Sequence, residues 1–290
     1  MTGKSGPALP LTRGGRKEER RIRRAERRRR DLKKRLRRPW LIFRKLIKRH
    51  VFEDAACAAT GLEDFGDQYY GSGLDRLLDS LRQADLSFCG RMMTQRAIVT
   101  ALKQRLLIQD LRKRIPQFFE SALLPPVIVT GLPRTGTTLL HRLLAQDPAS
   151  RAPSLEELIA PIRPRNKLTA HIDRARLSAE LFILRTFTSN LDSMHVSRAT
   201  AAEECMFALG PTFRSMLFWT LSPSYSYMEW YSRASRRKKY RDYRDILRVL
   251  QSHAPHRRLV LKAPDHLGGV GELLATIPEA LVVVCHRNPS

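Results

Sequence analysis

The sequence predicts an α/β fold built on a mostly parallel sheet. Three short apolar runs rich in β-branched residues are typical of buried parallel strands: VIVT (127–130), RLVLK (258–262) and ALVVVC (280–285). Helical patterns precede the first run and separate each run from the next. This order of a strand, a long helical insertion, a strand, a helix and a strand favours a parallel sheet wrapped by helices.

The predicted helices form two large groups on either side of the first strand. Residues 52–120 are a helical lead-in that contains LDRLLDSLRQADL and IVTALKQRLLIQDLRKRI, with breaks at Gly61, Gly66, Gly71 and Gly73. A helical insertion runs from Glu156 to about Leu250 and is interrupted by a polar and aromatic loop, LSPSYSYMEWYSRASRRKKY. A further helix, GGVGELLATI, joins the last two strands.

Most of the excess positive charge lies in an N-terminal tail. The chain of 290 residues carries a formal charge of +25, and residues 1–50 contain 21 Lys and Arg against 4 Asp and Glu. We expect residues 1–38 to be a disordered or partly helical basic tail, because so many like charges repel one another. Residues 39–290 are expected to form the folded domain.

The segment that follows Pro39 has three open interpretations. In PWLIFRKLIKRHVF, residues at helical spacing are apolar and basic side chains lie between them: Trp40, Phe43, Ile47 and Val51. The pattern fits the first helix of the folded core, a basic amphipathic helix on an anionic membrane, or an electrostatic arm on nucleic acid. Specific recognition of nucleic acid is the least favoured of the three.

Composition and the N-terminus predict a cytoplasmic protein. No stretch approaches the ~18 consecutive apolar residues of a membrane-spanning helix, and the N-terminus lacks the pattern of a secretory signal. Peripheral attachment to an anionic membrane through residues 16–51 stays open.

The four cysteines lie far apart and are expected to be reduced thiols. No group of Cys, His or carboxylate residues has metal-ligand spacing, so we expect no metal site.

The stretch GLPRTGTT, residues 131–138, lies between the first strand and a helical pattern, which is a favourable place to bind an anion. Unpaired backbone N–H groups and the positive end of the helix dipole meet there. Gly131 and Gly136 have the spacing of an ATP-binding phosphate loop, but Thr137 replaces the lysine that reaches the terminal phosphates. Arg134 supplies a cation inside the loop instead, which suits a single terminal anionic group bound without metal.

PRTGTT resembles the 5′-phosphosulfate-binding loop of sulfotransferases that use 3′-phosphoadenosine 5′-phosphosulfate (PAPS). The similarity is to a bacterial sulfotransferase group related to the tyrosylprotein sulfotransferases. It extends from TGLEDFGD (60–67) through the loop and RAPSLEEL to LVLKAPDHL and VVCHRNP, about four fifths of the chain. The resemblance implies a P-loop-like three-layer α/β core with a mostly parallel sheet, a helical N-terminal lead-in and a helical insertion.

The resemblance implies which residues bind the sulfuryl donor. The phosphosulfate group would be held by loop residues: Arg134, Thr135, Gly136, Thr137 and Thr138. In the family, an arginine that leaves the corresponding strand grips the 3′-phosphate of PAPS, and Arg287 takes its place here. Lys262 follows the second predicted strand and would line the same site, with a solvated strand end as the alternative.

A glutamate near RAPSLEEL is the general base in the resembling families. The alignment puts this role on Glu157 and puts Glu156 in place of the family's tryptophan, so the choice between the two glutamates stays open. On spacing alone, an acidic pair at the start of a helix is also expected from helix capping. The catalytic residues implied by the resemblance are therefore Glu157 and Arg134.

The residues that would bind the acceptor are less well defined than those that would bind the donor. The resemblance places His266 and His195 there, and it matches MHVSRATAAEECMF, which contains Glu203 and Glu204, to acceptor-site or structural residues. The pocket would be built from the helical insertion and its aromatic loop. This favours an apolar or amphiphilic acceptor near the aromatic residues Tyr225, Tyr227, Trp230 and Tyr231.

The sequence ends at Ser290, shortly after Arg287. In the family, a serine about two helical turns beyond this arginine assists in holding the 3′-phosphate. The resemblance therefore implies either a C-terminally truncated fragment or a protein that holds the 3′-phosphate less completely.

The leading hypothesis is a PAPS-dependent sulfotransferase. Glu157 would deprotonate a hydroxyl or amine of a small-molecule or lipid-like acceptor, and in-line attack on sulfur would release adenosine 3′,5′-bisphosphate without a metal. One alternative is a P-loop kinase, against which the missing lysine argues. Another is an inactive fragment that acts through its basic arm on membrane or nucleic acid. The oligomeric state stays open.

Overall fold

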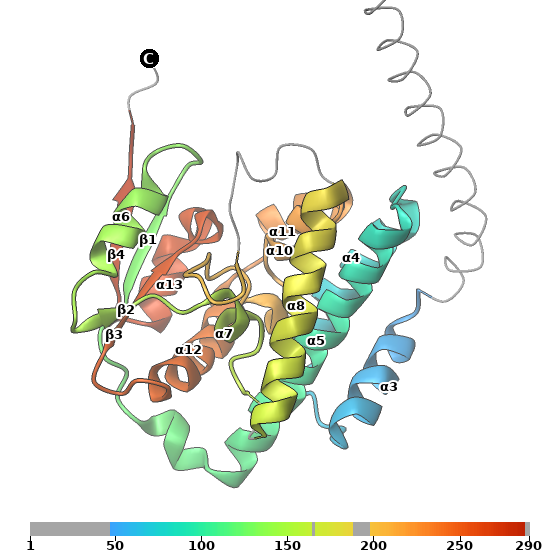
Figure 1. The fold of residues 1–290 in the computed structure, drawn as a ribbon, viewed down its shortest axis with the longest axis horizontal. Helices are drawn as coiled ribbons and strands as arrows, with labels where there is room; N and C mark the ends of the chain where they lie inside the picture. The colour runs from blue at the N-terminus through green and yellow to red at the C-terminus, as the bar shows by residue number, and fades with distance from the viewer. Residues whose placement is uncertain (1–46, 164–165, 188–197, 288–290) are drawn as a thin grey trace, which may run out of the picture. The chain divides into compact units, whose positions relative to one another are not determined.

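A four-stranded parallel sheet organises the part of the chain that carries the predicted loop (Figure 1). The structure, a computed structural model, describes residues 47–163, 166–187 and 198–287. The strands have the spatial order β2-β3-β1-β4, and each neighbouring pair is parallel. They are β1 (Val127–Gly131), β2 (Ser150–Arg151), β3 (Arg258–Lys262) and β4 (Leu281–Cys285). The predicted parallel sheet is confirmed.

Three of the strands lie where the sequence predicts them, and their carboxyl ends share one edge of the sheet. β1 pairs with both β3 and β4, so that Val129 lies opposite Lys262 and Gly131 lies opposite Cys285. This edge is where open α/β sheets bind ligands. The sequence does not predict β2, because a strand of two residues is too short to show an alternating pattern.

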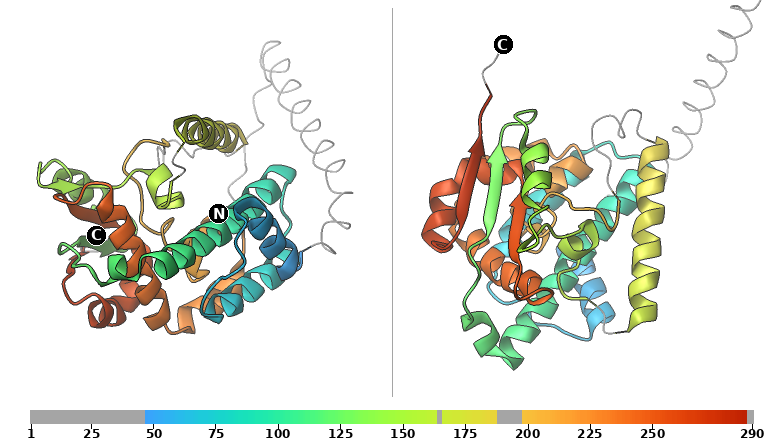
Figure 2. Two further views of the ribbon diagram at one scale, coloured as in Figure 1. Left: turned by 90° about the horizontal axis from the view of Figure 1, so that it is seen from below. Right: turned by 60° about the vertical axis from the view of Figure 1, so that its left-hand side comes forward.

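Helices cover both faces of the sheet, which gives the expected three layers. α6 (Thr137–Leu144) lies on one face, whereas α12 (Arg237–Ser252) and α13 (Val270–Thr276) lie on the other (Figure 2, right). On the α12 side, Ile128 and Leu261 of the sheet are buried in the main hydrophobic core together with aromatic and aliphatic side chains of α12. Removal of this apolar surface from water is the main driving force for the packing.

The predicted helical lead-in is confirmed. It consists of α3 (Arg49–Thr60), α4 (Tyr69–Gln83), α5 (Phe88–Arg114) and the short 3₁₀ helix η1 (Pro116–Glu120). α3 packs against α5, and Gly61 ends α3 in a left-handed conformation.

The predicted breaks at Gly71 and Gly73 are wrong, because both glycines lie inside α4. A Cβ at Gly73 would lie 2.2 Å from the backbone oxygen of Phe213, and a Cβ at Gly71 would collide with the guanidinium of Arg49. These glycines are therefore explained by close packing within a helix. The low helix propensity of glycine costs less free energy here than the close tertiary packing contributes.

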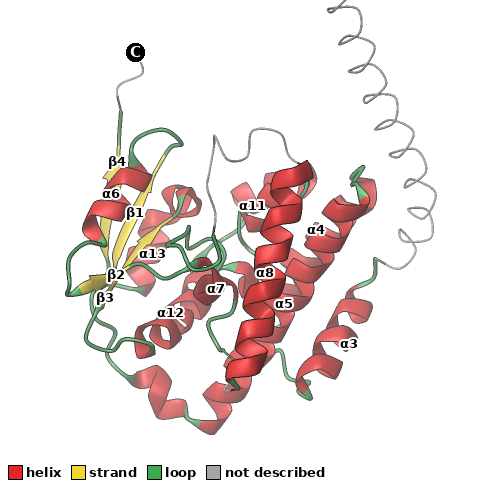
Figure 3. Ribbon diagram, viewed as in Figure 1, coloured by secondary structure: helices red, strands yellow, loops and turns green. Residues whose placement is uncertain are grey.

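The helical insertion is confirmed, but its aromatic segment is not a loop (Figure 3). The insertion contains α7 (Leu155–Ile159), α8 (Lys167–Phe187), η2 (Gly210–Thr212), α10 (Leu217–Leu221), α11 (Tyr225–Arg233) and α12. Tyr227 and Tyr231, which are four residues apart on α11, are buried, whereas Tyr225 is exposed. Burial of one face of α11 outweighs the polar composition that suggested a loop. The two buried tyrosines are core residues and do not line an open pocket.

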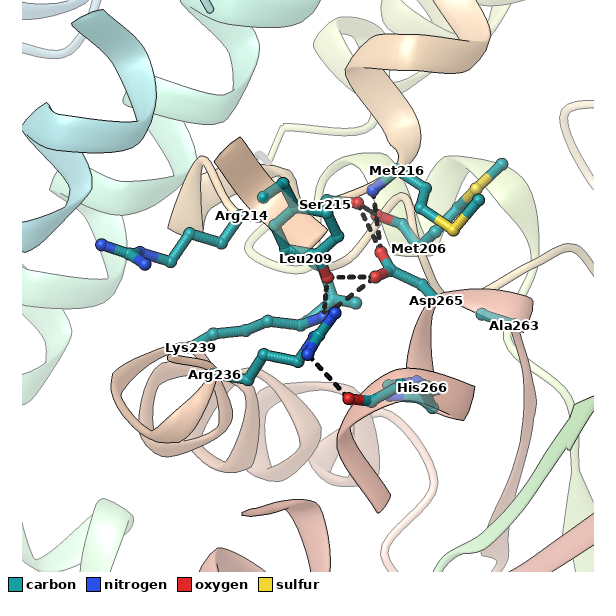
Figure 4. Close-up of polar contacts among 12 residues, drawn as sticks. Met206, Leu209, Arg214, Ser215, Met216, Arg236, Lys239, Ala263, Asp265 and His266 are labelled. Carbon is teal, nitrogen blue, oxygen red and sulfur yellow. Dashed lines mark hydrogen bonds and ion pairs between the residues drawn. The ribbon is translucent and has the colours of Figure 1, made fainter. Parts of the chain in front are cut away.

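Asp265 lies at the polar centre of the buried region between β3 and the helical insertion (Figure 4). It belongs to η3 (Pro264–Gly269), which directly follows β3. Its Oδ1 atom accepts hydrogen bonds from the Tyr231 hydroxyl and, at 3.0 Å, from Lys239 Nζ. Its Oδ2 atom accepts from Ser215 Oγ and from the Met216 N–H group, both at 3.0 Å. One carboxylate therefore joins three separate segments of the insertion.

The Asp265 carboxylate stays ionised because its partners compensate for its burial. Burial alone would raise its pKa, but Lys239 and the hydroxyl of Tyr231 hold the pKa below its ordinary value. Neither Asp265 nor Lys239 has exposed side-chain area. A buried ion pair of this kind is tolerated only when further hydrogen bonds satisfy both charges, and it becomes strongly destabilising when one partner is removed.

The described chain begins with a buried residue. Ile47 is only 2% exposed, whereas Val51 on α3 is 39% exposed. This favours core packing for the end of the amphipathic segment, and Trp40 and Phe43 lie outside the described residues. Among the helices of residues 47–163, 166–187 and 198–287, none is both long enough and apolar enough to cross a bilayer.

We predict that Asp265→Asn lowers the free energy of unfolding by about 3–5 kcal/mol, because it leaves the buried Lys239 charge without an opposite charge. Urea unfolding followed by circular dichroism measures this change. Asp265→Asn combined with Lys239→Met should lose less than the sum of the two single variants, because no uncompensated charge remains.

The matched control is Glu229→Gln, which removes an exposed carboxylate that pairs with Arg233 on α11. It should change stability by less than about 1 kcal/mol. A loss from Asp265→Asn as small as that of the control would contradict the structural role given to the buried pair.

Candidate active site

The predicted anion loop has the backbone of a phosphate-binding turn. β1 ends at Gly131 and α6 begins at Thr137, so GLPRTGTT leads directly from a buried strand to a helix N-terminus. Gly136 has a φ of 90° and Arg134 a φ of 68°, a left-handed conformation that is uncommon for a residue with a side chain. A Cβ at Gly131 would lie 2.6 Å from the carbonyl oxygen of Cys285. Glycine is therefore required where β1 passes β4.

The loop presents donors for an anion. The first N–H groups of α6 have no acceptor within the helix, and the positive end of the helix dipole lies there. Thr135 Oγ1 donates to the carbonyl of Leu132 at 2.7 Å, which stabilises the turn. The Arg134 side chain is exposed, and Thr137 and Thr138 are half-buried at the start of α6.

Lys262 brings a second cation to the loop. It is the last residue of β3, and its side chain is only 4% exposed. Its Nζ atom lies 3.3 Å from Thr138 Oγ1 and 2.6 Å from Glu204 Oε1. Because Val129 of β1 pairs with Lys262, the ammonium group arrives beside the strand that leads into the loop. Lys262 is therefore not a solvated strand end, and its ammonium group lies beside the start of α6.

Glu204 is the carboxylate that the described contacts bring next to the loop. The N–H of the following residue, Cys205, donates to the carbonyl of Lys262 at 2.9 Å, which holds the Glu204 segment against the end of β3. The Glu204 N–H itself donates to Glu203 Oε1 at 2.9 Å. The sequence marked this pair only as acceptor-site or structural residues. Glu204 therefore gains a definite position that spacing alone did not give.

Glu157, the predicted base, stabilises the start of α7. Its Oε2 atom accepts from the Ser154 N–H at 2.8 Å in a capping box. Its Oε1 atom contacts Arg151 at 2.9 Å and His253 at 3.2 Å. Burial would raise the pKa of Glu157, but His253, the Ser154 amide and Arg151 together hold it well below its ordinary value.

Glu157 contacts a residue that pairs with the start of β3, not with its end. Its partner Arg151 pairs with Leu259 near the start of β3, whereas Lys262 and the loop lie at the end of this strand. The three-residue separation corresponds to roughly 10 Å at about 3.3 Å per residue. Glu156 also points elsewhere, because it pairs with Arg174 of α8 and with Arg163. Among the described residues, no contact of Glu156 or Glu157 with the loop is observed, and the capping box accounts for the local position of Glu157.

The remaining predicted site residues have different positions. Arg287 is exposed and lies two residues beyond the Gly131–Cys285 pair, at the same edge of the sheet as the loop. His195 lies outside the described residues. His266 has no exposed area, so it cannot contact an acceptor in this conformation.

His266 supports the core below the site. Its Nε2 atom lies 3.2 Å from Cys205 Sγ, and its Nδ1 atom lies 3.4 Å from the Tyr240 hydroxyl. Burial, with the nearby charge of Lys239, lowers the pKa of His266 to about 3, so the ring is neutral near pH 7. This places His266 among the packing residues and not among those that meet a substrate.

The assembled site combines anion-binding groups with one carboxylate. Arg134, the amides of α6 and Lys262 can stabilise negative charge on a bound group, and Glu204 can accept a proton beside them. Within the part of the chain that the structure describes, no group of three His, Cys, Asp or Glu residues is arranged to hold a metal ion.

Comparisons with known proteins agree with this geometry. Residues 125–290 match the model of the sulfotransferase family. The structure is similar to sulfotransferase STF1 from Mycobacterium tuberculosis, with 32% identity and a TM-score of 0.68 over 83% of this chain and 67% of that protein. It is also similar to sulfotransferase STF9 from Mycobacterium avium, with 28% identity and a TM-score of 0.70 over 83% of this chain and 63% of that protein. A search of curated proteins gave no significant match.

The family match covers more than half of the chain, and the identity to STF1 extends over most of it. This family match is consistent with the fold, with the loop between β1 and α6 and with Lys262 at the end of β3. The chain belongs to the sulfotransferase family and is a transferase of that family.

Proposed function

We propose that this chain transfers the sulfuryl group of PAPS to a hydroxyl or amine of a small-molecule or lipid-like acceptor. The observation that carries the proposal is the convergence of Lys262 on Thr138, which places a buried ammonium group beside an anion loop that already contains Arg134. Family membership supports sulfuryl transfer, and the loop chemistry supports a donor with one terminal anionic group.

Each cation has a separate task in the proposed reaction. Arg134 and the amides at the start of α6 hold the phosphosulfate group of the donor. Lys262 faces the oxygen that bridges sulfur and phosphorus, where negative charge grows as the S–O bond breaks. Arg287 meets the 3′-phosphate, because it extends from β4 at the same edge of the sheet.

Glu204 is the base that the geometry supports in place of Glu157. As the acceptor oxygen or nitrogen bonds to sulfur, its proton passes to the Glu204 carboxylate, and the electron pair of the broken S–O bond stays on the departing 5′-phosphate. Glu204 Oε1 is occupied by Lys262, while no contact of Oε2 with the described residues is observed. The second oxygen is therefore the one that meets the acceptor proton.

The same proposal includes the organisation of the chain. Residues 1–38 would be a basic tail outside the sulfotransferase domain at 39–290. An anionic membrane surface could be reached through residues 16–51, which would suit a lipid-like acceptor.

Adenosine 3′,5′-bisphosphate is expected to raise the melting temperature of the protein, whereas ATP with Mg²⁺ is expected to leave it unchanged. The reason is that the loop lacks the lysine after Gly136 that an ATP-binding loop uses. Arg134→Ala should weaken bisphosphate binding by about tenfold, since it removes a charge-assisted contact to phosphate. Thermal unfolding measures the shift in melting temperature, and calorimetric titration measures the affinity of the unsubstituted protein and of Arg134→Ala for the bisphosphate.

Arg142→Ala is the matched control, because Arg142 is an exposed arginine on α6 just beyond the loop. It should change the affinity by less than about threefold. A thermal shift with ATP alone would favour the kinase hypothesis and contradict the proposed transfer from PAPS. Equal effects of the two arginine variants would show that the loop has no specific role.

Glu204→Gln is expected to lower turnover, whereas Glu157→Gln is expected to lower stability. Loss of a general base should lower kcat by about 10²–10⁴-fold, so Glu204→Gln should do this while bisphosphate affinity stays within about threefold. Glu157→Gln should mainly destabilise the fold by about 1–3 kcal/mol, because it removes charge-assisted hydrogen bonds at the start of α7. Bisphosphate release from PAPS with a panel of phenols, alcohols and amines measures kcat.

The pH dependence of stability provides a second readout for Glu157. Because its pKa is lowered in the folded state, Glu157 stabilises the protein above the unfolded-state pKa of about 4.3, and this stabilisation is lost as the pH falls below that value. Glu157→Gln should therefore flatten the loss of stability in acid. If Glu157→Gln abolished turnover in a protein of normal stability, Glu157 would be the base and the assignment of Glu204 would be wrong.

A further inference from the structure

Five arginines line a groove formed by α12 and by the ends of α5 and α13. Four of them come from α12 and one from the end of α5: Arg237, Arg241, Arg244, Arg248 and Arg112. The groove has a volume of about 410 Å³. This volume lies within the range of roughly 300–1,000 Å³ that is typical of small-molecule sites. We call it the arginine groove.

The spacing of the α12 arginines makes the groove a continuous cationic surface. The four arginines follow one another at intervals of four, three and four residues, which puts them on one side of the helix. The opposite side, including Tyr243, Leu247 and Leu250, is buried in the hydrophobic core. Ala275 and Thr276 at the end of α13 complete the lining, and small side chains there leave the space open.

The carboxylates near the groove neutralise only part of its charge. Asp245 is shared between Arg112 and Arg248, and Glu279 pairs with Arg244 at 2.7 Å. Two carboxylates therefore face five guanidinium groups, which leaves an excess of three positive charges. Arg237 and Arg241 are exposed, and no ion pair joins either of them to another described residue.

Arg244 and Arg248 lie close enough for their positive charges to repel each other. Burial, and then the neighbouring charge of Arg244, lowers the pKa of Arg248. The Nε atoms of Arg112 and Arg244 are buried, and within the described part of the chain they donate to no acceptor. A bound anion would relieve the repulsion and give the free guanidinium groups of Arg237 and Arg241 acceptors.

We propose that the arginine groove is a second anion site, which binds a ligand with at least two phosphate or sulfate groups. Guanidinium groups bind the paired oxygens of such groups in a planar, bidentate manner, and several arginines at helical spacing match more than one group. The site is separate from the proposed donor site, because α12 and α13 lie across the sheet from α6 and the loop (Figure 2, right). The inference does not depend on the proposed sulfuryl transfer.

The test uses the full chain with Arg134→Ala as a common background, so that the loop contributes little to anion binding. Inorganic pyrophosphate is titrated calorimetrically at fixed ionic strength, because surface charges are screened by salt. Arg237→Ala combined with Arg241→Ala should weaken binding by roughly tenfold for each arginine removed. Both side chains are exposed, so the unfolding midpoint should stay unchanged.

The control has the same change in charge at other exposed positions. Arg76→Ala combined with Arg176→Ala removes arginines from α4 and α8, outside the groove, and should weaken pyrophosphate binding by less than about threefold. If the groove variant has no larger effect than this control, the proposal is overturned, because binding then reflects net charge alone.

A second arm distinguishes the source of the phosphate groups. The same variants are sedimented with phosphatidylcholine vesicles that contain cardiolipin, a lipid with two phosphate groups, and with phosphatidylcholine alone. If the groove variant loses both pyrophosphate and anionic-vesicle binding relative to the control, the groove binds lipid headgroups. If only pyrophosphate binding is lost, the ligand is a soluble phosphate or sulfate ester. Both results support an anion site in the groove.

Discussion

The buried ion pair between Asp265 and Lys239 fixes the chain at the point where β3 ends. Removing two charges from water is costly, and the cost is offset only because Asp265 also accepts from Tyr231, Ser215 and Met216. The carboxylate therefore has one satisfactory arrangement of its neighbours. A buried polar network that is fully satisfied specifies a single packing of the elements that contribute to it.

The Asp265–Lys239 pair is connected to the candidate active site by a short stretch of backbone. Lys262 lies three residues before Asp265, its carbonyl accepts from the Cys205 N–H, and the next carbonyl, that of Ala263, accepts from Thr130 Oγ1 at 2.9 Å. The end of β3 is thus held on one side by β1 and on the other by the Glu204–Cys205 segment. The Lys262 ammonium is positioned before any ligand arrives, which is the condition for effective electrostatic stabilisation.

The fold could be predicted from the sequence because its strands are apolar runs and its helices have apolar periodicity. The site could be predicted only in part. A glutamate three residues after a serine has the same appearance in the sequence whether it caps a helix or removes a proton, so the sequence does not show that Glu157 forms a capping box. The pairing of Lys239 with Asp265 spans 26 residues and has no periodic pattern, so only the folded chain reveals it. Glycines inside α4 were misinterpreted because tertiary contact overrides propensity.

The replacement of the expected lysine by Thr137 has a consequence for the proposed reaction. An ATP-binding loop carries its own lysine, whereas here the loop carries Arg134 and the ammonium group comes from Lys262 of β3, which is paired with Glu204 at 2.6 Å. In the resting site the two charges largely cancel. When Glu204 accepts the acceptor proton, Lys262 loses its counter-charge at the moment when negative charge grows on the departing oxygen. Proton transfer and stabilisation of the leaving group are then coupled through one ion pair, so that the interaction is stronger in the transition state than in the ground state, which is what accelerates a reaction.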